Sequence, residues 1–406
     1  MGWLGLDDTD SLAGGCTTET FHQLLLGLPK EVEVGEPRLV RLWPFAFRRT
    51  RGNAALAVEL KCPDEAALLA HLDAWWEHHL APLGGRMEAS TVSSRPQSPA
   101  SPGMVWFRDA PGADFYWKAV RGDVTAEPLP GALRSWGGEG CIGATAAVAW
   151  PATTVTWEAI AWRCQGVQGP RLVDASALAD IDGWSNIVFS RDPRRGHQLV
   201  APRGNSPVLF GVRSRTKVDA ERAGQRLLDA EGTEAVSGLR VFQTNQASGD
   251  HLDCVYRLTV LEKNVEPVRK HVQLITNGRP VQAYAEGGPV NALARWMEVG
   301  DVFEVRGLVG PDGVLHAEQL RLVTAKPRRK KRPKCSSCEV TLKSMGAGQG
   351  LRCPSCKERS VDAWVEVPAH PPADGWVEPE VDARRHLARP LEWDENGEGF
   401  LAASKR

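Results

Sequence analysis

Three carboxylates stand within four positions near the N-terminus, in the stretch GLDDTDSLAGGCTTET at residues 5–20. Asp7, Asp8 and Asp10 would repel one another unless a cation or several hydrogen-bond donors offset their charge. Carboxylate oxygens are the ligands that a hard cation such as magnesium prefers. Aspartates also serve as turn and capping residues in Asp/Gly-rich loops, so composition by itself leaves both interpretations open.

The residues that follow these aspartates suit a polyphosphate. Gly14 and Gly15 allow the backbone to approach a phosphate, and a helix expected from about Thr17 to Leu28 adds free N–H groups at its N-terminus. Thr17 and Thr18 carry hydroxyl groups at the position where a terminal phosphate would lie. The stretch therefore suits magnesium and a polyphosphate, while a turn and capping role for the aspartates remains the alternative.

A second group of candidate ligands lies near the C-terminus. Its two C-x2-C pairs are separated by fourteen residues and consist of Cys335, Cys338, Cys353 and Cys356. This spacing lets all four thiolates face one tetrahedral ion, and four cysteines leave no open position for catalysis. The pattern predicts a structural zinc ribbon, and zinc is favoured over disulfides in a reducing compartment.

Charge is segregated along the chain although the formal net charge is only −1. Residues 326–334, KPRRKKRPK, contain seven Lys and Arg residues and no acid, whereas residues 357–406 contain eleven Asp and Glu against seven Lys and Arg. A run of this kind is often a solvated linker. Beside a zinc ribbon, binding to a phosphate backbone is the favoured interpretation.

The elements expected along the chain divide it into regions of different class. Alternating strands and helices at the N-terminus predict an α/β region, and a Ser/Pro-rich linker or loop follows at 88–103. An α+β region starts near residue 140, and short strands with Gly-rich turns from about 263 suit a small barrel of the OB type. No run approaches the roughly 18 apolar residues of a membrane span. No signal peptide is found, so we expect a cytoplasmic protein.

Several segments together resemble one known family. GLDDTDS and GGCTT resemble the opening of the archaeal synthetases that attach agmatine to the wobble cytidine of the AUA-decoding isoleucine tRNA. Further segments are similar to that family in the same order and span about residues 3–356: RTRGNAALAVEL, GCIGATAA, PVLFGVR, FQTNQASGDHL and GQGLRC. The fixed order makes the resemblance specific.

The resemblance implies a layout and a reaction. The layout is a kinase-like α/β domain at 1–135, a ferredoxin-like domain at 136–262, an OB fold at 263–325, a basic linker with the zinc ribbon at 326–360, and an acidic tail at 361–406. The reaction condenses agmatine with C2 of the cytidine in the CAU anticodon of isoleucine tRNA and switches decoding from AUG to AUA. ATP is split to AMP and phosphates, and the threonine after the family's cysteine is phosphorylated. That residue is Thr17 by position, with Thr18 as the alternative.

Three more segments supply candidate site residues. Arg51 and Asn53 are candidates for contact with phosphate or tRNA, although a surface turn would use the same residues. Gly140 and Gly143 belong to a Gly-rich turn suited to close approach of a nucleotide, and Cys141 between them is expected to be a buried small side chain. A pocket for the guanidinium of agmatine is expected at the segment with a carboxylate and amides, from Asn245, Gln246, Asp250 and His251.

Two other functions fit parts of the sequence. A non-catalytic protein that binds RNA or single-stranded DNA would need the barrel and the ribbon but neither the aspartates nor Thr17. A ligase for a different amine is conceivable because relatives usually carry a His-Thr-Pro element where this chain reads RGNSP at 203–207.

Overall fold

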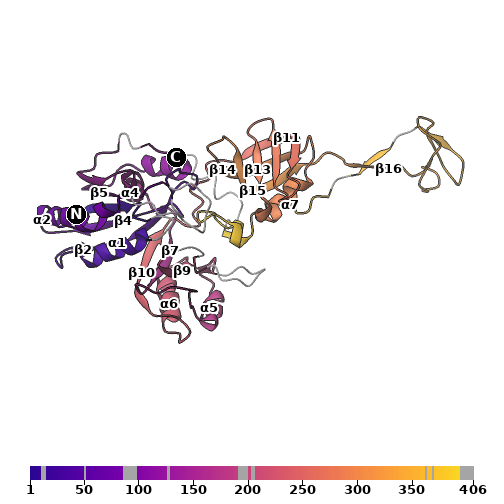
Figure 1. Cartoon of the computed structure of the whole chain (residues 1–406). Coiled ribbons are helices and arrows are strands. Elements are labelled where there is room, and N and C mark those ends of the chain that lie inside the picture. The colour runs from indigo at the N-terminus through magenta and orange to yellow at the C-terminus, as the bar shows by residue number, and fades with distance from the viewer. Residues whose placement is uncertain are drawn as a thin grey trace. The chain divides into compact units, whose positions relative to one another are not determined.

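The structure is a computed structural model. It describes residues 1–10, 15–49, 52–85, 98–125, 129–190, 200–202, 206–361, 364–367 and 370–393. The chain forms two compact units (Figure 1): one comprises Met1–Asp253 with Val381–Arg406, and the other comprises Cys254–Glu380. The mixed α/β architecture expected from the sequence is confirmed.

The first unit is built on one ten-stranded sheet with the order β6-β5-β1-β4-β3-β10-β7-β9-β8, and β2 pairs with β4. Its strands are β1 (Gly2–Asp7), β2 (Glu33–Val34), β3 (Arg38–Arg41), β4 (Ala54–Lys61), β5 (Gly103–Phe107), β6 (Arg134–Gly137), β7 (Thr156–Arg163), β8 (Ile187–Val188), β9 (Val208–Ser214) and β10 (Val236–Thr244). Two domains are expected to meet between residues 135 and 136, and this one sheet includes strands from both of them. The two sets of strands join where β10 pairs in parallel with β3.

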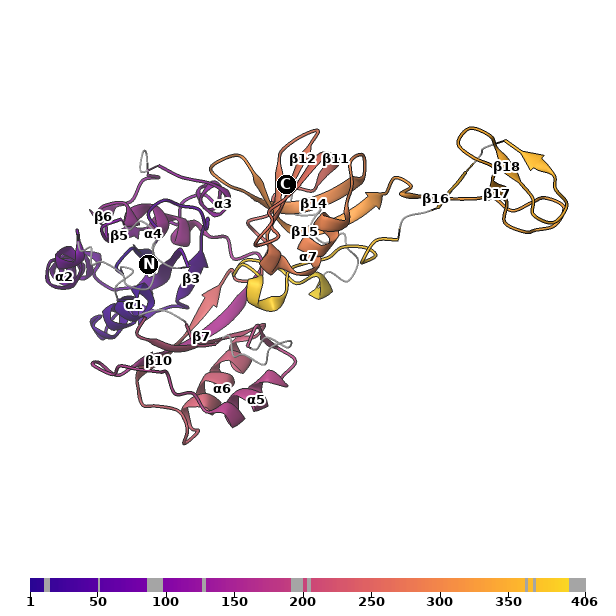
Figure 2. The same ribbon diagram turned by 45° about the vertical axis from the view of Figure 1, so that its right-hand side comes forward.

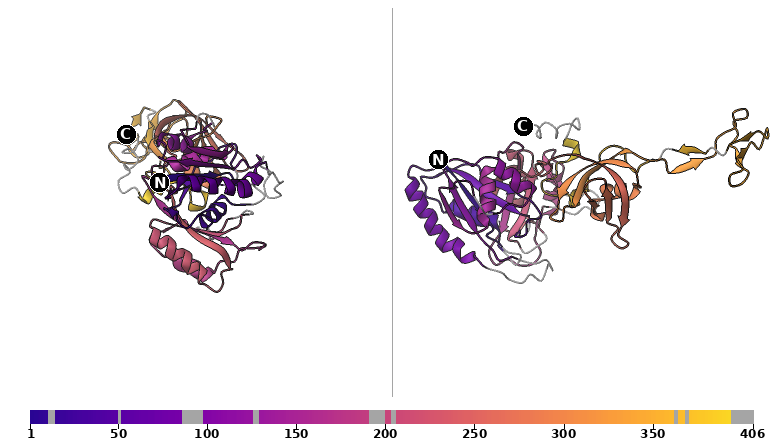
Figure 3. Two further views of the ribbon diagram at one scale, coloured as in Figure 1. Left: turned by 90° about the vertical axis from the view of Figure 1, so that its left-hand side faces the viewer. Right: turned by 90° about the horizontal axis from the view of Figure 1, so that it is seen from above.

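Helices cover both faces of the N-terminal half of this sheet. Leucines of α1 (Thr17–Leu26) and α2 (Glu65–Trp75) pack on one face, and α3 (Asp114–Arg121) and α4 (Gly140–Ala149) pack on the other. Alternation along β4 supplies both layers, since Leu56 faces the first core and Ala55 the second. In the second half, α6 (Lys217–Leu228) packs on β7 and β9, and α5 (Ala175–Asp182) lies beside α6 and β8 (Figure 2; Figure 3).

Small residues let α4 lie close to the strands. All of its residues except Ile142 are buried, as expected for a helix that is apolar all round. A Cβ on Gly5 of β1 would lie 2.6 Å from the carbonyl oxygen of Ala144. The segment at 140–144, expected as a turn, is therefore the first part of a buried helix.

The second unit contains a closed barrel and the ribbon. The barrel order is β11-β12-β13-β15-β14, with β11 (Tyr256–Val265), β12 (Val272–Thr276), β13 (Val281–Ala283), β14 (Val302–Val309), β15 (Leu315–Thr324) and the helix α7 (Pro289–Trp296). The barrel thus begins before residue 263. In the expected linker, β16 (Arg329–Lys331) pairs with β20 (Val365–Val367), so strand pairing extends beyond residue 360.

The remaining short elements complete the chain. The ribbon has β17 (Lys343–Ser344), β18 (Leu351–Arg352) and β19 (Arg359–Ser360), and the C-terminal segment has the 3-10 turns η4 (Val381–Ala383) and η5 (Leu391–Trp393). Helix α2 ends at Trp75 and continues as a π-helical turn, η1 (Trp76–Leu80), followed by the 3-10 turn η2 (Ala81–Leu83). A further 3-10 turn, η3 (Ala285–Gly287), precedes α7. Among the described residues, no helix is long and apolar enough to cross a membrane.

Candidate active site

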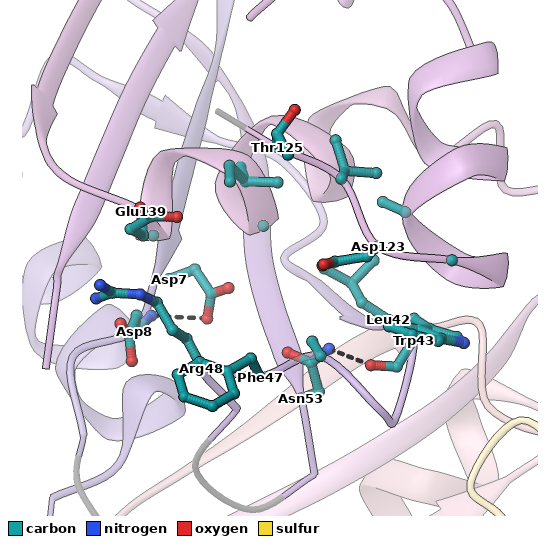
Figure 4. Close-up of a pocket in the computed structure, with 17 residues that line it drawn as sticks. Asp7, Asp8, Leu42, Trp43, Phe47, Arg48, Asn53, Asp123, Thr125 and Glu139 are labelled. Carbon is teal, nitrogen blue, oxygen red and sulfur yellow. Dashed lines mark hydrogen bonds between the residues drawn. The ribbon is translucent and has the colours of Figure 1, made fainter. Parts of the chain in front are cut away.

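The first part of the site is the end of β1, where Asp7 is the last residue of the strand and Asp8 follows it (Figure 4). Asp8 has a left-handed backbone with φ +57°, and its N–H donates to Asp7 Oδ1 at 2.7 Å. The N–H of Ser101 donates to Asp8 Oδ2 at 2.9 Å. A Cβ on Gly143 of α4 would lie 1.9 Å from Asp7 Oδ2, so only glycine leaves room for the carboxylate there.

Burial and mutual repulsion disfavour negative charge on both residues. The pKa of Asp7 lies well above its ordinary value, first because of burial and then because of Asp8. Burial also raises the pKa of Asp8 to about 7, with a smaller contribution from Asp10, while the N–H of Ser101 opposes the shift. Buried carboxyl groups that repel one another ionise more readily when a cation binds beside them.

A cavity of about 280 Å³ opens beside these carboxylates, and we call it the aspartate cavity. Its charged lining is mostly acidic, with Asp7, Asp8, Asp123 and Glu139 against one cation, Arg48. Trp43 and Phe47 add aromatic surface (Figure 4). The chemistry of this lining suits a divalent cation or an organic cation.

The second part of the site is the start of α1. Thr17 Oγ1 donates to Asp10 Oδ1 at 3.3 Å. Thr18 Oγ1 lies 2.9 Å from Cys16 Sγ and accepts from the indole N–H of Trp162 at 3.1 Å. No side chain caps the helix N-terminus at Cys16. The Thr17 hydroxyl therefore donates a hydrogen bond to a carboxylate, whereas the Thr18 hydroxyl accepts one from a buried tryptophan.

These hydroxyls line another cavity of about 510 Å³, the threonine cavity. Glu158 of β7 lies at its base between two guanidinium groups, 3.7 Å from Arg41 Nη2 and 3.4 Å from Arg213 Nε. Gln246 Nε2 also donates to Glu158. Arg384 and His386 from the C-terminal segment complete the basic lining, and Asp10 and Asp382 add carboxylates.

The three aspartates face two different cavities. Asp7 and Asp8 line the aspartate cavity, and Asp10 lines the threonine cavity. Among the described residues, one group of three or more possible metal ligands has its donor atoms close together, and it consists of the four ribbon cysteines. The aspartates do not converge on one point in this way.

The other predicted nucleotide contacts have separate positions. Asn53, with φ +43°, lines both cavities and donates from Nδ2 to the carbonyl of Trp43 at 2.6 Å. Gly140 and Gly143 line the aspartate cavity, and Gly15 has φ +80° before α1. Gly14 and Arg51 lie outside the described residues, as do residues 203–205 of the RGNSP element.

The segment expected to hold agmatine is buried beneath the threonine cavity. Asn245, Gln246, Asp250 and His251 are all under 9% exposed, and none of them lines either cavity. Asn245 accepts from the N–H of Arg41 at 2.7 Å and donates to its carbonyl at 2.9 Å. Asp250 accepts from the hydroxyl of Tyr116 at 2.6 Å. These contacts place the segment as support for Arg41 and Glu158.

Sequence reasoning missed four residues of the threonine cavity: Arg41, Glu158, Arg213 and His386. Glu158 and Arg213 left a faint signal as charges beside apolar runs in β7 and β9, whereas Arg41 shares the short strand β3 with another arginine and left none. His386 left none, since its segment has no regular pattern. Only the tertiary structure brings these residues together.

The four ribbon cysteines form two knuckles of the same geometry. Their Sγ atoms all lie within 4.8 Å of one another. Glu339 and Lys357, which follow the second cysteine of each pair, both have left-handed φ, +54° and +65°. Their N–H groups donate to the carbonyls of Cys335 and Cys353 at 2.9 and 3.1 Å. This matched pair of turns fits a tetrahedral zinc ion.

Comparison with known proteins gives matches along the whole chain. Three family models match it: the TiaS TCKD domain at residues 3–65, the TiaS FLD domain at 138–251, and the TiaS C-terminal zinc ribbon domain at 332–367. The tRNA 2-agmatinylcytidine synthetase TiaS of Cenarchaeum symbiosum is 28% identical, over 95% of this chain and 91% of the relative. The same protein of Methanopyrus kandleri is 29% identical, over 96% of each chain.

Solved structures show the same similarity. Apo TiaS is 26% identical with a TM-score of 0.77, and a complex of TiaS with its isoleucine tRNA and ATP is 26% identical with a TM-score of 0.76. Each match covers 96% of this chain and 97% of the other. Because three TiaS domain models match in succession and TiaS relatives match over nearly their whole length, the chain belongs to the tRNA 2-agmatinylcytidine synthetase (TiaS) family.

Proposed function

We propose that this protein is an ATP-dependent ligase that attaches agmatine to C2 of the wobble cytidine in the CAU anticodon of isoleucine tRNA. The observation that carries the proposal is the position of Thr17. Its hydroxyl meets a carboxylate where α1 begins and lines the cavity that contains the arginines. A binding protein without catalysis would need neither the hydroxyl nor the buried, mutually repelling aspartates.

The parts of the fold take the following roles in this proposal. The N-terminal half of the large sheet is the kinase-like domain, and the half with α5 and α6 is the ferredoxin-like domain. The closed five-stranded barrel is the OB fold, and the ribbon binds zinc as a structural ion. The separate matches to the TiaS TCKD, FLD and zinc ribbon domain models support this division.

In the proposal Asp7 and Asp8 hold magnesium from the aspartate cavity, directly or through its waters, and Asp10, which lines the threonine cavity, contacts the ion through water. Bound magnesium supplies positive charge to the phosphates of ATP, which is most of what phosphoryl transfer requires. The elevated pKa of Asp7 and of Asp8 supports this role, since a cation would relieve the repulsion that causes part of each shift. Asp10 also accepts a hydrogen bond from the Thr17 hydroxyl, which orients that oxygen for attack on a phosphoryl group.

The chemistry at the base follows from the poor leaving ability of the C2 oxygen of cytosine. Phosphorylation of that oxygen converts it into a leaving group. The primary amine of agmatine then forms the C2–N bond while the C2–O bond breaks, phosphate departs, and a nearby carboxylate accepts the proton that the amine loses. Arginines of the threonine cavity would stabilise the charge that develops on the departing phosphate.

Agmatine carries two positive charges, and the aspartate cavity is the described cavity whose lining complements them. Asn245, Gln246, Asp250 and His251 act in this proposal as positioning residues. They hold Arg41, Glu158 and Tyr116 rather than touch the amine.

The basic run at 326–334 and the ribbon would contact the tRNA backbone. Apart from Arg328, which pairs with the buried carboxylate of Asp301, the cations of this run would release counterions on binding, so affinity should fall steeply as salt rises.

The test is a reaction of the purified full-length protein with ATP labelled at the γ-phosphate, magnesium, agmatine and an isoleucine tRNA transcript with a CAU anticodon. Mass spectrometry of the digested tRNA should show agmatine on the wobble cytidine, and a transcript with a GAU anticodon should remain unmodified. Asp7→Asn should lower the rate by about 100-fold or more while tRNA affinity stays unchanged.

Tight tRNA binding without ATP turnover would instead leave a binding protein. If another amine enters the tRNA in preference to agmatine when both are present, the protein is a ligase of the proposed kind with a different amine substrate.

A further inference from the structure

The chain returns to the first unit after the ribbon, and residues 381–393 form what we call the return segment (yellow, beside β7 and β10 in Figure 1 and Figure 2). The carbonyls of His386 and Leu387 accept from the N–H groups of Ala247 and Gly249, both at 2.8 Å. Leu387 is 3% exposed and packs in the core between the sheet and α3 and α4. The segment is thus seated in the unit that carries the candidate active site.

Seating this segment places its side chains in the threonine cavity. Asp382, Arg384 and His386 all line that cavity together with Thr17 and Thr18. Gly52 makes room for the guanidinium of Arg41, with which a Cβ there would clash, and His386 Nε2 lies 3.6 Å from the same Cβ position. The imidazole therefore stands beside Arg41 near the hydroxyl groups.

The surroundings of His386 are electropositive. Arg41, burial and Arg213, in that order, hold the pKa of His386 well below its usual range. The carboxylate of Glu158 is already shared between these two arginines and Gln246. Asp10 pairs with Thr17, so a neutral imidazole faces two guanidinium groups without an anion of its own in these contacts.

We propose that His386, delivered by the return segment, forms with Arg41 and Arg213 a cradle for the phosphoryl group that is transferred at Thr17. This inference rests on the proposed function. A phosphoryl group is a dianion near neutral pH, and two guanidinium groups with one imidazole offer several donors to it. His386 is a phosphoryl-binding residue in this scheme and gives up no proton in the chemistry.

The scheme predicts proton uptake. When the phosphoryl group arrives, its negative charge offsets that of Arg41 and Arg213 and raises the pKa of His386, so the imidazole gains a proton. The other charged groups that line the cavity are Asp10, Glu158, Asp382 and Arg384. Asp10 is engaged with Thr17 and Glu158 with the two arginines, and the scheme assigns the proton to His386.

The first experiment is calorimetry of inorganic pyrophosphate binding to the full-length protein in two buffers of different ionisation enthalpy at pH 7. The wild type should take up a proton on binding. His386→Gln keeps the backbone contacts and a hydrogen-bonding side chain, and it should bind without proton uptake and about tenfold more weakly. His370→Gln, at an exposed histidine outside the return segment, should behave as the wild type.

A second measurement identifies the source of the phosphoryl group. If His386→Gln no longer transfers the label of γ-labelled ATP to Thr17 but keeps its affinity for ATP, the cradle binds the phosphothreonine. A matching loss of ATP affinity assigns it to the nucleotide, and either result supports the proposal.

Unchanged proton uptake and pyrophosphate affinity in His386→Gln would overturn it. The proposal would also be overturned if His386→Gln lowered the melting temperature of the ligand-free protein and still took up a proton on binding pyrophosphate. His386 would then have a structural role. If the wild-type protein takes up a proton on binding pyrophosphate but modifies no tRNA, the proposed function is wrong and the anion-binding cradle still stands.

Discussion

Asp8 combines a left-handed backbone with a carboxylate whose charge is disfavoured by burial. Its pKa is raised from 3.8 to about 7 in the folded chain, so the folded state retains a proton that the unfolded chain has lost. Stability contributed by this residue is therefore present at low pH and is lost as the pH rises from about 4 to 7. Magnesium must compete with that proton.

Two consequences of the Asp8 shift are measurable. The dissociation constant for magnesium should rise by about tenfold per pH unit below pH 7, as titration calorimetry would show. Asp8→Asn should make the metal-free protein more stable at pH 8, by roughly 1–2 kcal/mol after allowance for solvent screening, because asparagine removes the buried charge and tolerates left-handed φ. It should also abolish activity. A less stable variant at pH 8 would contradict this view of the site.

The two threonines are expected to respond differently to substitution. Thr17→Ala should eliminate label from γ-labelled ATP on the protein and leave stability nearly unchanged, since the Thr17 hydroxyl contacts only the solvent-accessible carboxylate of Asp10 in the described contacts. Thr18→Ala should retain the label and cost about 1–2 kcal/mol, because the buried indole N–H of Trp162 would lose its acceptor. Label that persists in Thr17→Ala and disappears in Thr18→Ala would reverse the assignment.

At the scale of elements, the first turn of α4 shapes the end of β1. Alanine is favoured over glycine in a helix by about 1 kcal/mol, so a glycine at position 143 needs a reason. That reason is the Asp7 carboxylate, which an added Cβ would meet at 1.9 Å. The helix and the strand can approach only when this position has no side chain.

Gly143→Ala should therefore destabilise the protein by about 1–3 kcal/mol and weaken magnesium binding by displacing Asp7. Chemical denaturation and calorimetry would measure the two effects. Gly112→Ala is the matched control, since a Cβ there meets nothing within 4 Å. Equal behaviour of the two variants would mean that α4 shifts freely and does not hold the carboxylate.

At the scale of the whole molecule, the division into two units separates the candidate chemistry from the candidate zinc site. The aspartates and threonines belong to the first unit, whereas the four cysteines belong to the second. A closed tetrahedral zinc site is expected to stabilise the ribbon locally. Loss of the metal should therefore affect one unit only.

Cys353→Ser, or removal of zinc by a chelator, should abolish ordered structure in the ribbon and lower tRNA affinity by about tenfold or more while ATP affinity stays unchanged. Hydrogen exchange would show increased exchange confined to the ribbon. Cys254→Ser, at an exposed thiol outside the ribbon, is the control. A simultaneous loss of ATP binding would show that the two units depend on each other for stability.

The sequence by itself determined the features whose residues lie close together along the chain. The aspartates and Thr17 are at most ten positions apart, so a strand followed by a helix must bring them near one another. The C-x2-C pairs likewise carry their ligand spacing within two short turns. The existence and class of most strands and helices followed from apolar periodicity, which depends on local residue order.

Only the tertiary structure decided the rest. The threonine cavity joins Arg41, Glu158, Arg213 and His386 from β3, β7, β9 and the return segment. Their meeting depends on the parallel pairing of β3 with β10 and on the path of a chain that leaves the first unit and re-enters it. The burial that raises the pKa of Asp7 and lowers that of His386 has the same origin. Strand order and burial result from packing between segments far apart in sequence, and no local pattern records them.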